Sequence, residues 1–362
     1  MDFIAYAASH GFDLAIIADL EQNDEALSLS QSAGIDVQVI PSLVTQQKML
    51  YRFTDTVPQV LWHQRVARLL RQQHREAEIV WVQNGALPWL PLGTYFRTAE
   101  KIVWGPVGGG ETPSAAMMQR LTTGDRLREN GRLLLEKLGL TMKARAFRRH
   151  ASLQLVTLAR TGAASAVLAR RFSAHAVPVI PEILRPMAAT NITRSPGGRA
   201  RFVWVGQDIP RKNLRLALQL FSQLRERFFH DATLDIYGVE GGVVSAPEVH
   251  YHGWVPCIDW SGYRDDGILL LTSFREGLPS VVLEAASHGL LCLCSDVGAL
   301  ASLHLPNICV LPREEYPDFL HTTIDELARQ VKSHLTLSVL SLPSRDYRTD
   351  LTTYLQQAGI IQ

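Results

Sequence analysis

The chain has 362 residues, a length that suits two domains better than one. Hydrophobic residues make up 46% and charged residues 20%, so the composition excludes a disordered or fibrous protein. The net charge of +1 gives no reason to expect nucleic acid as a partner. No apolar run approaches the ~18 to 20 residues that span a bilayer, and no basic-then-apolar leader follows Met1. We therefore expect a cytoplasmic protein, with its four cysteines as buried, inert thiols.

Short apolar runs rich in β-branched residues alternate with helical patterns along the whole chain, which predicts parallel α/β sheets. The first half has a predicted helix at 58–73 and predicted strands at 14–19, 37–40, 79–83, 101–104 and 153–157. The second half has predicted strands at 201–206, 233–238, 249–253, 267–273, 291–296 and 307–311, and predicted helices at 213–227, 280–288 and 317–334.

Composition also divides the chain. Residues 186–199 combine Pro186, Pro196, Gly197 and Gly198 with small polar residues, which is typical of a linker. The expected domains are therefore 1–185 and 200–345. Residues 346–362 are expected to form a C-terminal helix that packs back on the first domain.

The beginning of the chain departs from the usual order of a doubly wound domain. Residues 3–8 have the pattern of the end of a helix, Gly11 is suited to its C-cap, and residues 14–19 already correspond to a second strand. Such a domain normally opens with a buried strand and a glycine-rich turn. We therefore expect that the first strand and its turn are missing from this chain.

The most informative segment follows the strand at 267–273. Its loop contains Glu276, Gly277, Leu278 and Pro279, and the next helix carries Glu284. In open α/β sheets, ligands bind at the carboxyl ends of the strands, and amides at a helix start favour a pyrophosphate. Glu276 is placed to accept hydrogen bonds from sugar hydroxyls, and Glu284 to hold the two ribose hydroxyls. The alternative is that both are solvated glutamates.

A second segment follows the strand at 201–206. That strand ends at Gly206, and Gln207 begins a short loop that ends in Arg211 and Lys212. Arg offers a fork for phosphate oxygens and Lys a point charge, so both can stabilise a departing nucleoside diphosphate. A solvated basic helix start is the competing interpretation.

These two segments resemble the donor-binding domain of retaining GT-B glycosyltransferases of family 4. The E-x7-E pattern is matched by Glu276 and Glu284, and the VG-x5-KN pattern by the residues from Val205 to Asn213. The resemblance implies that Glu276 contacts the transferred sugar, Glu284 the ribose and Lys212 the pyrophosphate. Most of the family has Arg where this chain has Gln207, which removes one phosphate cation, and Arg211 is a candidate to compensate.

The first half resembles the family more loosely, through the stretch Trp104 to Glu111, which is like the WGPxGGGE stretch of a bacterial exopolysaccharide and capsule subgroup. Gly108, Gly109 and Gly110 would line the acceptor side of a cleft between the domains. The implied fold is GT-B, two Rossmann-like doubly wound domains that face a cleft. The first would bind the acceptor, which is lipid-linked or a saccharide, and the second a UDP- or GDP-sugar.

The chain has no Asp-x-Asp triplet and no cluster with metal-ligand spacing, so no metal or other cofactor is expected. Two alternatives to an active transferase stay open: a catalytically impaired GT-B relic that acts as a binding partner, and a sugar-nucleotide epimerase. The absent first strand and Gln207 favour the relic.

The stretch 120–150 holds nine Lys and Arg residues against three Asp and Glu residues, interleaved with leucines. A basic amphipathic helix of this kind can lie on an anionic membrane surface, which would make the protein peripheral to the inner face of the membrane. A solvated helix face is the alternative.

Overall fold

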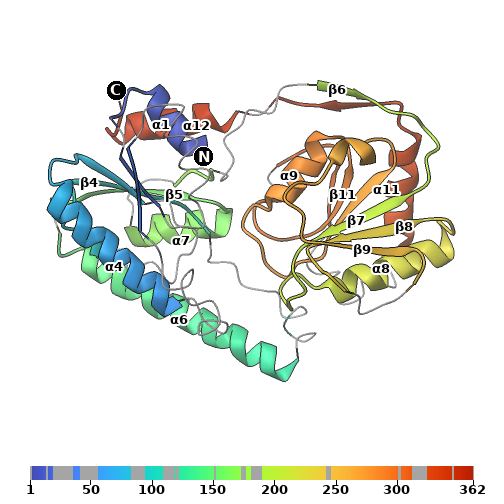
Figure 1. Ribbon diagram of the computed structural model, residues 1–362, viewed down its shortest axis with the longest axis horizontal. Helices are drawn as coiled ribbons and strands as arrows, with labels where there is room; N and C mark the ends of the chain where they lie inside the picture. Colours follow the sequence, from blue (N-terminus) through green and yellow to red (C-terminus); the bar gives the residue numbers. More distant parts are fainter. Residues whose placement is uncertain are drawn as a thin grey trace. The chain divides into compact units, whose positions relative to one another are not determined.

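The structure is a computed structural model, and it describes residues 2–13, 15–18, 36–40, 56–82, 94–108, 118, 122–150, 152–172, 177–180, 190–241, 246–300, 303–311, 324–344 and 346–361. The chain divides into two compact units, which we describe separately (Figure 1). Unit 1 comprises Met1–Gly110, Gly131–Arg185 and Asp346–Gln362, and unit 2 comprises Glu111–Asn130 and Pro186–Arg345.

Unit 1 is built on parallel strands. A two-stranded sheet pairs β1 (Ala15–Ala18) with β2 (Asp36–Val39), and a three-stranded sheet has the order β3-β4-β5 (Ile79–Val82, Lys101–Val107 and Gln154–Ala159). The helices are α1 (Asp2–Ser9), α4 (Thr56–Gln73), α6 (Thr123–Phe147), α7 (Gly162–Phe172) and α12 (Tyr347–Gln357). The first turns of α6 fall in unit 2 and the rest of this helix in unit 1.

One hydrophobic core holds unit 1 together. It is formed by buried residues of β3, β4 and β5 together with residues of three helices, among them Ala67 of α4, Ala144 of α6 and Leu168 of α7. Ile17 of β1 packs against the same cluster, so the smaller sheet shares this core. Burial of such apolar side chains is the main favourable term in folding, and it fixes which face of each helix turns inward.

The two ends of the chain lie together in unit 1. The hydroxyl groups of Tyr6 in α1 and Thr352 in α12 are 2.8 Å apart. Beyond α12, Lys101 Nζ donates to the Gly359 carbonyl at 3.0 Å, and the Gln154 side chain donates to the Ala358 carbonyl. The C-terminal segment is thus tied to α1 and to the beginnings of β4 and β5.

Unit 2 contains a six-stranded parallel sheet in the order β12-β11-β10-β7-β8-β9. The strands are β7 (Arg201–Val205), β8 (Thr233–Tyr237), β9 (Val249–Gly253), β10 (Gly267–Leu271), β11 (Leu291–Ser295) and β12 (Ile308–Leu311). Every residue of β10 and β11 is buried. This pattern is typical of parallel strands that are covered by helices on both faces.

The helices of unit 2 are α8 (Leu214–Arg227), α9 (Ser280–Ser287), α11 (Ile324–Thr336) and the short 3-10 helix η3 (Trp260–Tyr263). The crossover from β7 to β8 and the crossover from β10 to β11 run in opposite directions along the sheet. Because such crossovers are right-handed, α8 and α9 lie on opposite faces, as Figure 1 shows. α11 packs against α8.

Residues 186–199, expected to be a linker, include the strand β6 (Thr190–Thr193), which pairs antiparallel with β13 (Val339–Leu342). Only Ile192 of β6 is buried, so the strand has almost no apolar pattern by which its sequence could be recognised. Next to it, Arg194 donates to the backbone carbonyls of Arg264, Asp265 and His334, which fastens this ribbon to the rest of unit 2.

The predicted strands and helices that fall on described residues are present, with bounds within a few residues of the prediction. The helix predicted at 317–334 is observed as α11, and residues 317–323 lie outside the described residues. A helix at the start of the chain followed by Gly11, with φ of +75°, is also confirmed. The burial of Cys292 and Cys294 is confirmed, but Cys309 is half-buried and Cys257 is exposed, so the prediction of four buried thiols was wrong. Among the described residues, none of the helices is long and apolar enough to cross a membrane.

A buried histidine makes the stability of unit 1 dependent on pH. Nδ1 of His63 lies 2.6 Å from the Tyr95 hydroxyl, and burial lowers the pKa of His63 from 6.5 to about 4. Between these values the unfolded chain binds a proton that the folded chain does not. The free energy of unfolding should therefore fall as the pH is lowered from 6.5 toward 4.

Between pH 7 and pH 5, His63→Gln should remove about 2 kcal/mol of this pH dependence, because pH 5 lies about 1.5 units below the ordinary pKa of 6.5 and one unit corresponds to about 1.4 kcal/mol. Urea unfolding of wild type and variant at pH 7 and pH 5 measures the difference. His334 in unit 2, whose burial lowers its pKa to about 3, should keep part of the trend in both proteins. Equal pH dependence in the two proteins would contradict the prediction.

Candidate functional site

The candidate site lies where the connections of the unit 2 sheet change direction. β7 and β10 are adjacent parallel strands, with Phe202 opposite Ile268 in register. From β7 the chain proceeds to β8 and β9 on one side, and from β10 it proceeds to β11 and β12 on the other. The loops that leave the carboxyl ends of β7 and β10 therefore diverge to opposite faces and leave a crevice, which is the usual ligand site in open α/β sheets.

The loop after β7 begins with a close approach of two backbones. Gly206 donates its amide to the Tyr237 carbonyl at 3.0 Å, and a Cβ on Gly238 would lie 2.5 Å from the Gly206 carbonyl oxygen. Gly238 has φ of +91°, which favours glycine. The end of β8 can therefore lie against the end of β7 only because position 238 lacks a side chain.

The same loop ends at Lys212 and Asn213. Asn213 is the N-cap of α8 and has the left-handed values φ 53° and ψ 51°, a conformation that Asn tolerates better than most residues. Thr272, directly after β10, donates to the carbonyls of Lys212 and Asn213, at 3.1 and 2.9 Å. The Phe274 amide donates to the Arg211 carbonyl at 2.9 Å. These bonds fasten the β7–α8 loop to the β10–α9 loop.

Three charged side chains meet between the two loops. Oε1 of Glu276 lies 2.7 Å from Lys212 Nζ and 2.8 Å from an amino nitrogen of Arg211. The Glu276 side chain is only 10% exposed. Burial alone would raise the pKa of Glu276, but the positive charges of Lys212 and Arg211 outweigh it and the pKa lies below its ordinary value. The cluster is thus one carboxylate with two cations, which leaves an excess of positive charge for an anionic ligand.

Arg275 has a different role from its neighbours. Its carbonyl accepts a hydrogen bond from Arg211 at 3.1 Å, and its guanidinium forms an ion pair with Glu129 at 2.9 Å, a residue of the same unit. The positive charge of Arg275 is therefore balanced by Glu129, while its backbone helps to hold Arg211 in place.

Helix α9 begins directly after this loop. Its N-cap is Pro279, which has φ of −69° and ψ of 114°, and in this fully described helix no side chain caps the first turn and no acidic residue occupies it. The first amides of a helix have no acceptor within the helix. Together with the positive end of the helix dipole they can bind phosphate oxygens.

The other predicted donor residues lie close by in sequence but differ in exposure. Gly277 and Leu278 are half-buried and Pro279 is buried. Glu284 lies on the exposed face of α9, and its side chain forms no ion pair or hydrogen bond with another described residue. Gln207 is exposed at the beginning of the β7–α8 loop. The structure therefore joins Arg211, Lys212 and Glu276 directly, while Glu284 and Gln207 remain accessible to a ligand.

The predicted acceptor side belongs to unit 1. Gly108 is buried and directly follows β4, whereas Gly109 and Gly110 lie outside the described residues. β4 itself extends to Val107, three residues beyond its predicted end. Within it, a Cβ on Gly105 would lie 2.3 Å from the Leu158 carbonyl oxygen, so glycine is required there for the close pairing of β4 with β5.

Sequence analysis missed three residues that shape the site: Thr272, Gly238 and Gly298. Gly298 has φ of +61°, and a Cβ there would lie 1.6 Å from the Gly277 carbonyl oxygen. The Ala299 amide donates to the same carbonyl at 3.2 Å. An Asp-x-Gly sequence directly after a buried strand, here residues 296–298, is a signal that could have identified Gly298.

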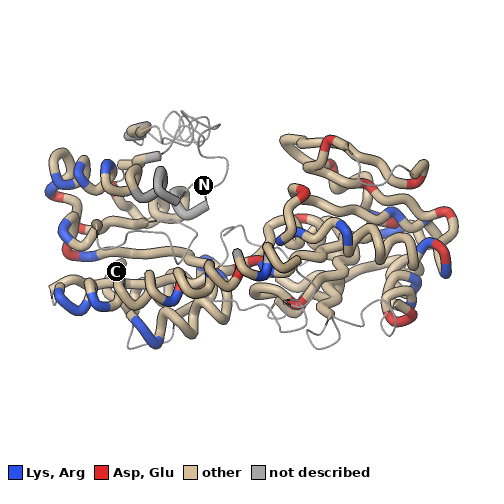
Figure 2. The backbone as a smooth tube through the Cα atoms, turned by 90° about the horizontal axis from the view of Figure 1, so that it is seen from below, with Lys and Arg blue, Asp and Glu red and all other residues tan. Residues whose placement is uncertain are grey.

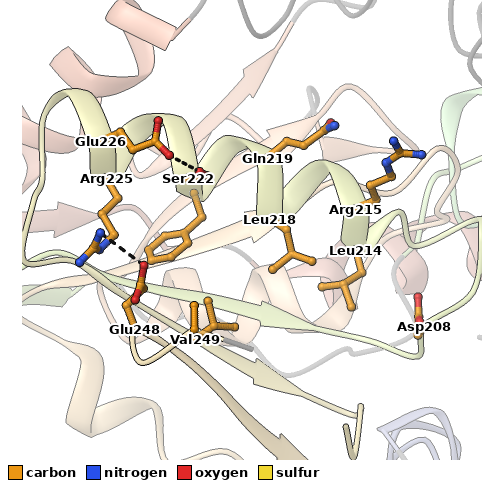
Figure 3. Close-up of a pocket in the computed structure, with 12 residues that line it drawn as sticks. Asp208, Leu214, Arg215, Leu218, Gln219, Ser222, Arg225, Glu226, Glu248 and Val249 are labelled. Atoms are coloured by element: carbon orange, nitrogen blue, oxygen red, sulfur yellow. Dashed lines mark hydrogen bonds and ion pairs between the residues drawn. The ribbon is translucent and has the colours of Figure 1, made fainter. Parts of the chain in front are cut away.

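A separate cavity in the described part of the chain lies away from this cluster. A groove of about 650 Å³ runs along α8 beside the beginning of β9, with Leu214, Leu218 and Val249 on its apolar wall (Figure 3). The ion pair between Arg225 and Glu248, at 3.3 Å, lies at one end. None of the lining residues belongs to the Arg211–Lys212–Glu276 cluster. We therefore place the candidate site at the cluster, where charge and free helix amides meet, and not in the groove.

Metal ligands do not gather in the described portion of the chain: no group of three or more His, Cys, Asp and Glu side chains there could hold a metal ion. Among the described residues, Arg211 and Lys212 bring positive charge to the candidate site.

One family model matches a region in the second half of the chain. The family model described as glycosyl transferases group 1 matches residues 199–332, which include β7, α8, α9 and most of α11. The matched region therefore contains both loops of the candidate site. No curated protein matches the sequence.

Solved structures give the fold of the whole chain. A lipopolysaccharide outer core galactosyltransferase, WaaB in its apo form, is similar with a TM-score of 0.50 and 14% identity, over 95% of this chain and 99% of that chain. A sucrose-phosphate synthase from Thermosynechococcus elongatus has a TM-score of 0.52 and 12% identity, over 95% and 98%. An α,α-trehalose 6-phosphate synthase from Burkholderia multivorans has 0.53 and 10%, over 96% and 98%. The chain thus has the α/β GT-B fold with parallel sheets.

Gly298→Ala should disturb the loop that carries Glu276. A left-handed φ costs alanine about 1 to 2 kcal/mol, and the new methyl group would collide with the Gly277 carbonyl. We expect the free energy of unfolding to fall by at least about 2 kcal/mol and the Ala299 amide to exchange hydrogen faster. Urea unfolding and hydrogen exchange measure the two effects.

Gly241→Ala is the matched control, because no atom lies within 4 Å of a Cβ at this loop position. It should leave both quantities nearly unchanged. Wild-type stability and wild-type exchange at residue 299 in Gly298→Ala would show that the close approach to Gly277 does not constrain the loop.

Proposed function

We propose that this protein is a retaining glycosyltransferase of family 4 that transfers a sugar, of the hexosyl type, from a nucleotide-sugar donor to an acceptor hydroxyl without a metal ion. The observation that supports the proposal most is the cluster of Arg211, Lys212 and Glu276 beside the uncapped start of α9, at the switch point of the sheet. The group 1 match over residues 199–332 and the GT-B fold support it independently.

Donor binding follows from the chemistry of these groups. The amides at the start of α9 and the cations of Lys212 and Arg211 would bind the diphosphate. Glu276, which stays ionised because of its two cationic neighbours, would accept hydrogen bonds from sugar hydroxyls. Glu284, exposed on α9, would accept them from the ribose. Arg211 would supply the charge that an Arg at position 207 provides in most of the family.

The reaction would depend on positioning and on charge stabilisation. The bond between the anomeric carbon and the diphosphate oxygen breaks, and negative charge grows on the leaving diphosphate, where Lys212 and Arg211 lie. The acceptor oxygen forms the new bond on the same face of the sugar, and its proton passes to an oxygen of the leaving phosphate. No enzymic nucleophile is needed in this scheme.

The acceptor is proposed to be a lipid-linked or polysaccharide molecule of exopolysaccharide or capsule assembly. Support comes from the WGPxGGGE-like stretch, of which Gly108 lies buried at the end of β4. Gly108, Gly109 and Gly110 are proposed to lie on the acceptor side.

Binding of UDP and GDP, measured by calorimetry, tests the donor site. Lys212→Ala should weaken binding of the preferred nucleotide by about tenfold to a hundredfold, because a hydrogen bond to a charged group contributes ~1.5 to 3 kcal/mol. Glu284→Ala should weaken it by about tenfold. The control Glu326→Ala removes a glutamate from the outer part of α11 and should have no effect.

Absence of nucleotide binding in the folded wild-type protein, or equal affinity in all four proteins, would contradict the proposed donor site.

Turnover with a panel of nucleotide sugars and lipid-linked acceptors tests catalysis. Glu276→Gln should lower transfer by at least about a hundredfold while diphosphate binding is kept or strengthened, because Lys212 and Arg211 lose their carboxylate partner. EDTA should leave the wild-type rate unchanged. Product analysis by NMR should show the donor's anomeric configuration.

Nucleotide binding without transfer or donor hydrolysis would indicate the relic, and isomerisation of the donor without an acceptor would indicate the epimerase. An inverted product would contradict retention.

A further inference from the structure

Helix α6 presents an apolar stripe to solvent. Of the large hydrophobic side chains that are exposed in the described part of the chain, five lie on this one helix: Leu127, Leu134, Leu135, Leu138 and Met142. Leu127 is 74% exposed and Met142 is 70% exposed. Leu134, Leu138 and Met142 follow one another at intervals of four residues, so they line a single face of the helix.

The opposite face of α6 is the one that packs on unit 1. Leu140 and Ala144 are buried in the hydrophobic core, and Phe147 packs against the rings of Phe96 and Phe172. The exposed stripe is therefore not needed to pack α6 on unit 1, because the helix already buries a separate apolar face there. Contiguous apolar surface of this kind on a folded protein marks a binding surface.

From Leu134 to Met142, the exposed charge beside the stripe is positive. Residues 130–149 contain six Lys and Arg residues and a single acidic residue, Glu136. Glu136 is 4% exposed and is paired with Arg132 at 2.6 Å, so it does not reach the outer surface. Lys137, Arg145, Arg148 and Arg149 are all exposed. The outer face of this segment thus combines leucine and methionine with cations alone.

Helix α4 carries further positive charge. It shares the hydrophobic core of unit 1 with α6, and Figure 1 shows the two helices on the same side of the sheet. Arg65, Arg68 and Arg71 of α4 are exposed, and residues 56–75 contain no Asp or Glu. In Figure 2 the helices of unit 1 accordingly carry blue with little red.

We propose that the outer face of α6, with the arginines of α4 beside it, docks on the surface of an anionic lipid bilayer. Leucine and methionine side chains would enter the headgroup and acyl boundary, and lysine and arginine would meet lipid phosphates. The absence of any exposed acidic residue at 130–149 favours lipid over a protein partner, since the rim of a protein interface usually carries both signs of charge. The helix lies on the bilayer and does not cross it. This surface is independent of the donor site.

Vesicle sedimentation of the full chain tests the proposal. The probes are vesicles of phosphatidylcholine alone and vesicles with a third of phosphatidylglycerol. Wild type should sediment with the anionic vesicles and not with the neutral ones, and binding should weaken as salt is raised. Lys137→Gln with Arg145→Gln should weaken binding about thirtyfold, because both basic residues lie near the anionic surface and each contributes a similar share of the binding free energy.

A second variant tests the apolar stripe. Leu134→Gln, Leu138→Gln and Met142→Gln together keep helix propensity nearly constant and remove no buried side chain, so the protein should fold. Binding to anionic vesicles should fall by at least about tenfold. The control variant, Arg329→Gln with Lys332→Gln, removes two exposed cations from α11 and should bind as wild type.

Urea unfolding serves as the folding check for all variants, because it reports on unit 1, which contains the substituted part of α6. The donor site lies in unit 2, so a failure of donor binding in wild type would leave the vesicle result unaffected. The proposal is overturned if wild type does not sediment with anionic vesicles, if it binds neutral vesicles equally well, or if the α11 control loses as much binding as the α6 variants. Self-association in light scattering that is lost in the triple glutamine variant, without vesicle binding, would assign the stripe to a second copy of the chain and also overturn it.

Discussion

The structure of the candidate site depends on one contact, the carboxylate of Glu276 held between Lys212 and Arg211. Glu276 lies 64 positions after Lys212 in the sequence. The residues meet because β7 and β10 are neighbours in the sheet while their crossovers turn to opposite faces. A carboxylate that is 10% exposed would be costly to keep ionised alone, and two cations without a counter-charge would repel each other. Each part of the cluster is therefore stable in its position only because the others are there. The topology of the sheet thus decides the chemistry that this edge can carry.

Glycine residues allow the loops that carry these charges to lie close to their neighbours. Gly238 lies against Gly206 where β8 and β7 end, and Gly298 lies against Gly277 where β11 approaches the β10–α9 loop. At Gly238 and Gly298 the backbone has positive φ and a side chain would meet a carbonyl group of the neighbouring loop. Thr272 then ties the two main loops together through the carbonyls of Lys212 and Asn213. The loops that carry the cluster are consequently held by these contacts, which positions the charges before any ligand binds and would reduce the reorganisation that binding requires.

The sequence was sufficient for the strands and helices of unit 2 because β10 and β11 are continuous apolar runs bounded by turn residues, a strong local signal. The sequence also identified the loops at 206–212 and 276–279, because glycine, proline and charged residues directly after a buried strand are more easily explained by a ligand site than by packing. It could not supply the ion pairs of Glu276, which depend on strand order, or the roles of Gly238 and Gly298, which depend on contacts between distant loops. The strand β6 was not predicted, because a strand with one buried residue has no alternating pattern of apolar and polar residues. In α6, composition suggested an amphipathic basic helix, but only the structure shows that Phe147 turns inward while Leu134 and Leu138 turn outward.

The resting state of the cluster also bears on how a donor would be accepted. Lys212 and Arg211 both point their charge at one oxygen of Glu276, so the site is already compensated in part. A diphosphate that arrives at the start of α9 competes with this carboxylate for the same cations, and the partial release of Glu276 leaves its lone pairs available to sugar hydroxyls. A free phosphate, or a nucleotide without a sugar, would pair with the two cations but would donate no hydrogen bond to the displaced carboxylate of Glu276. This exchange would favour binding of the complete nucleotide sugar over binding of its fragments. A buried carboxylate that loses a cation and gains no hydrogen bond in return is left unsatisfied, which costs free energy. In the proposed function the ion cluster would therefore select the ligand as well as bind it, and this selectivity would depend on the burial of Glu276.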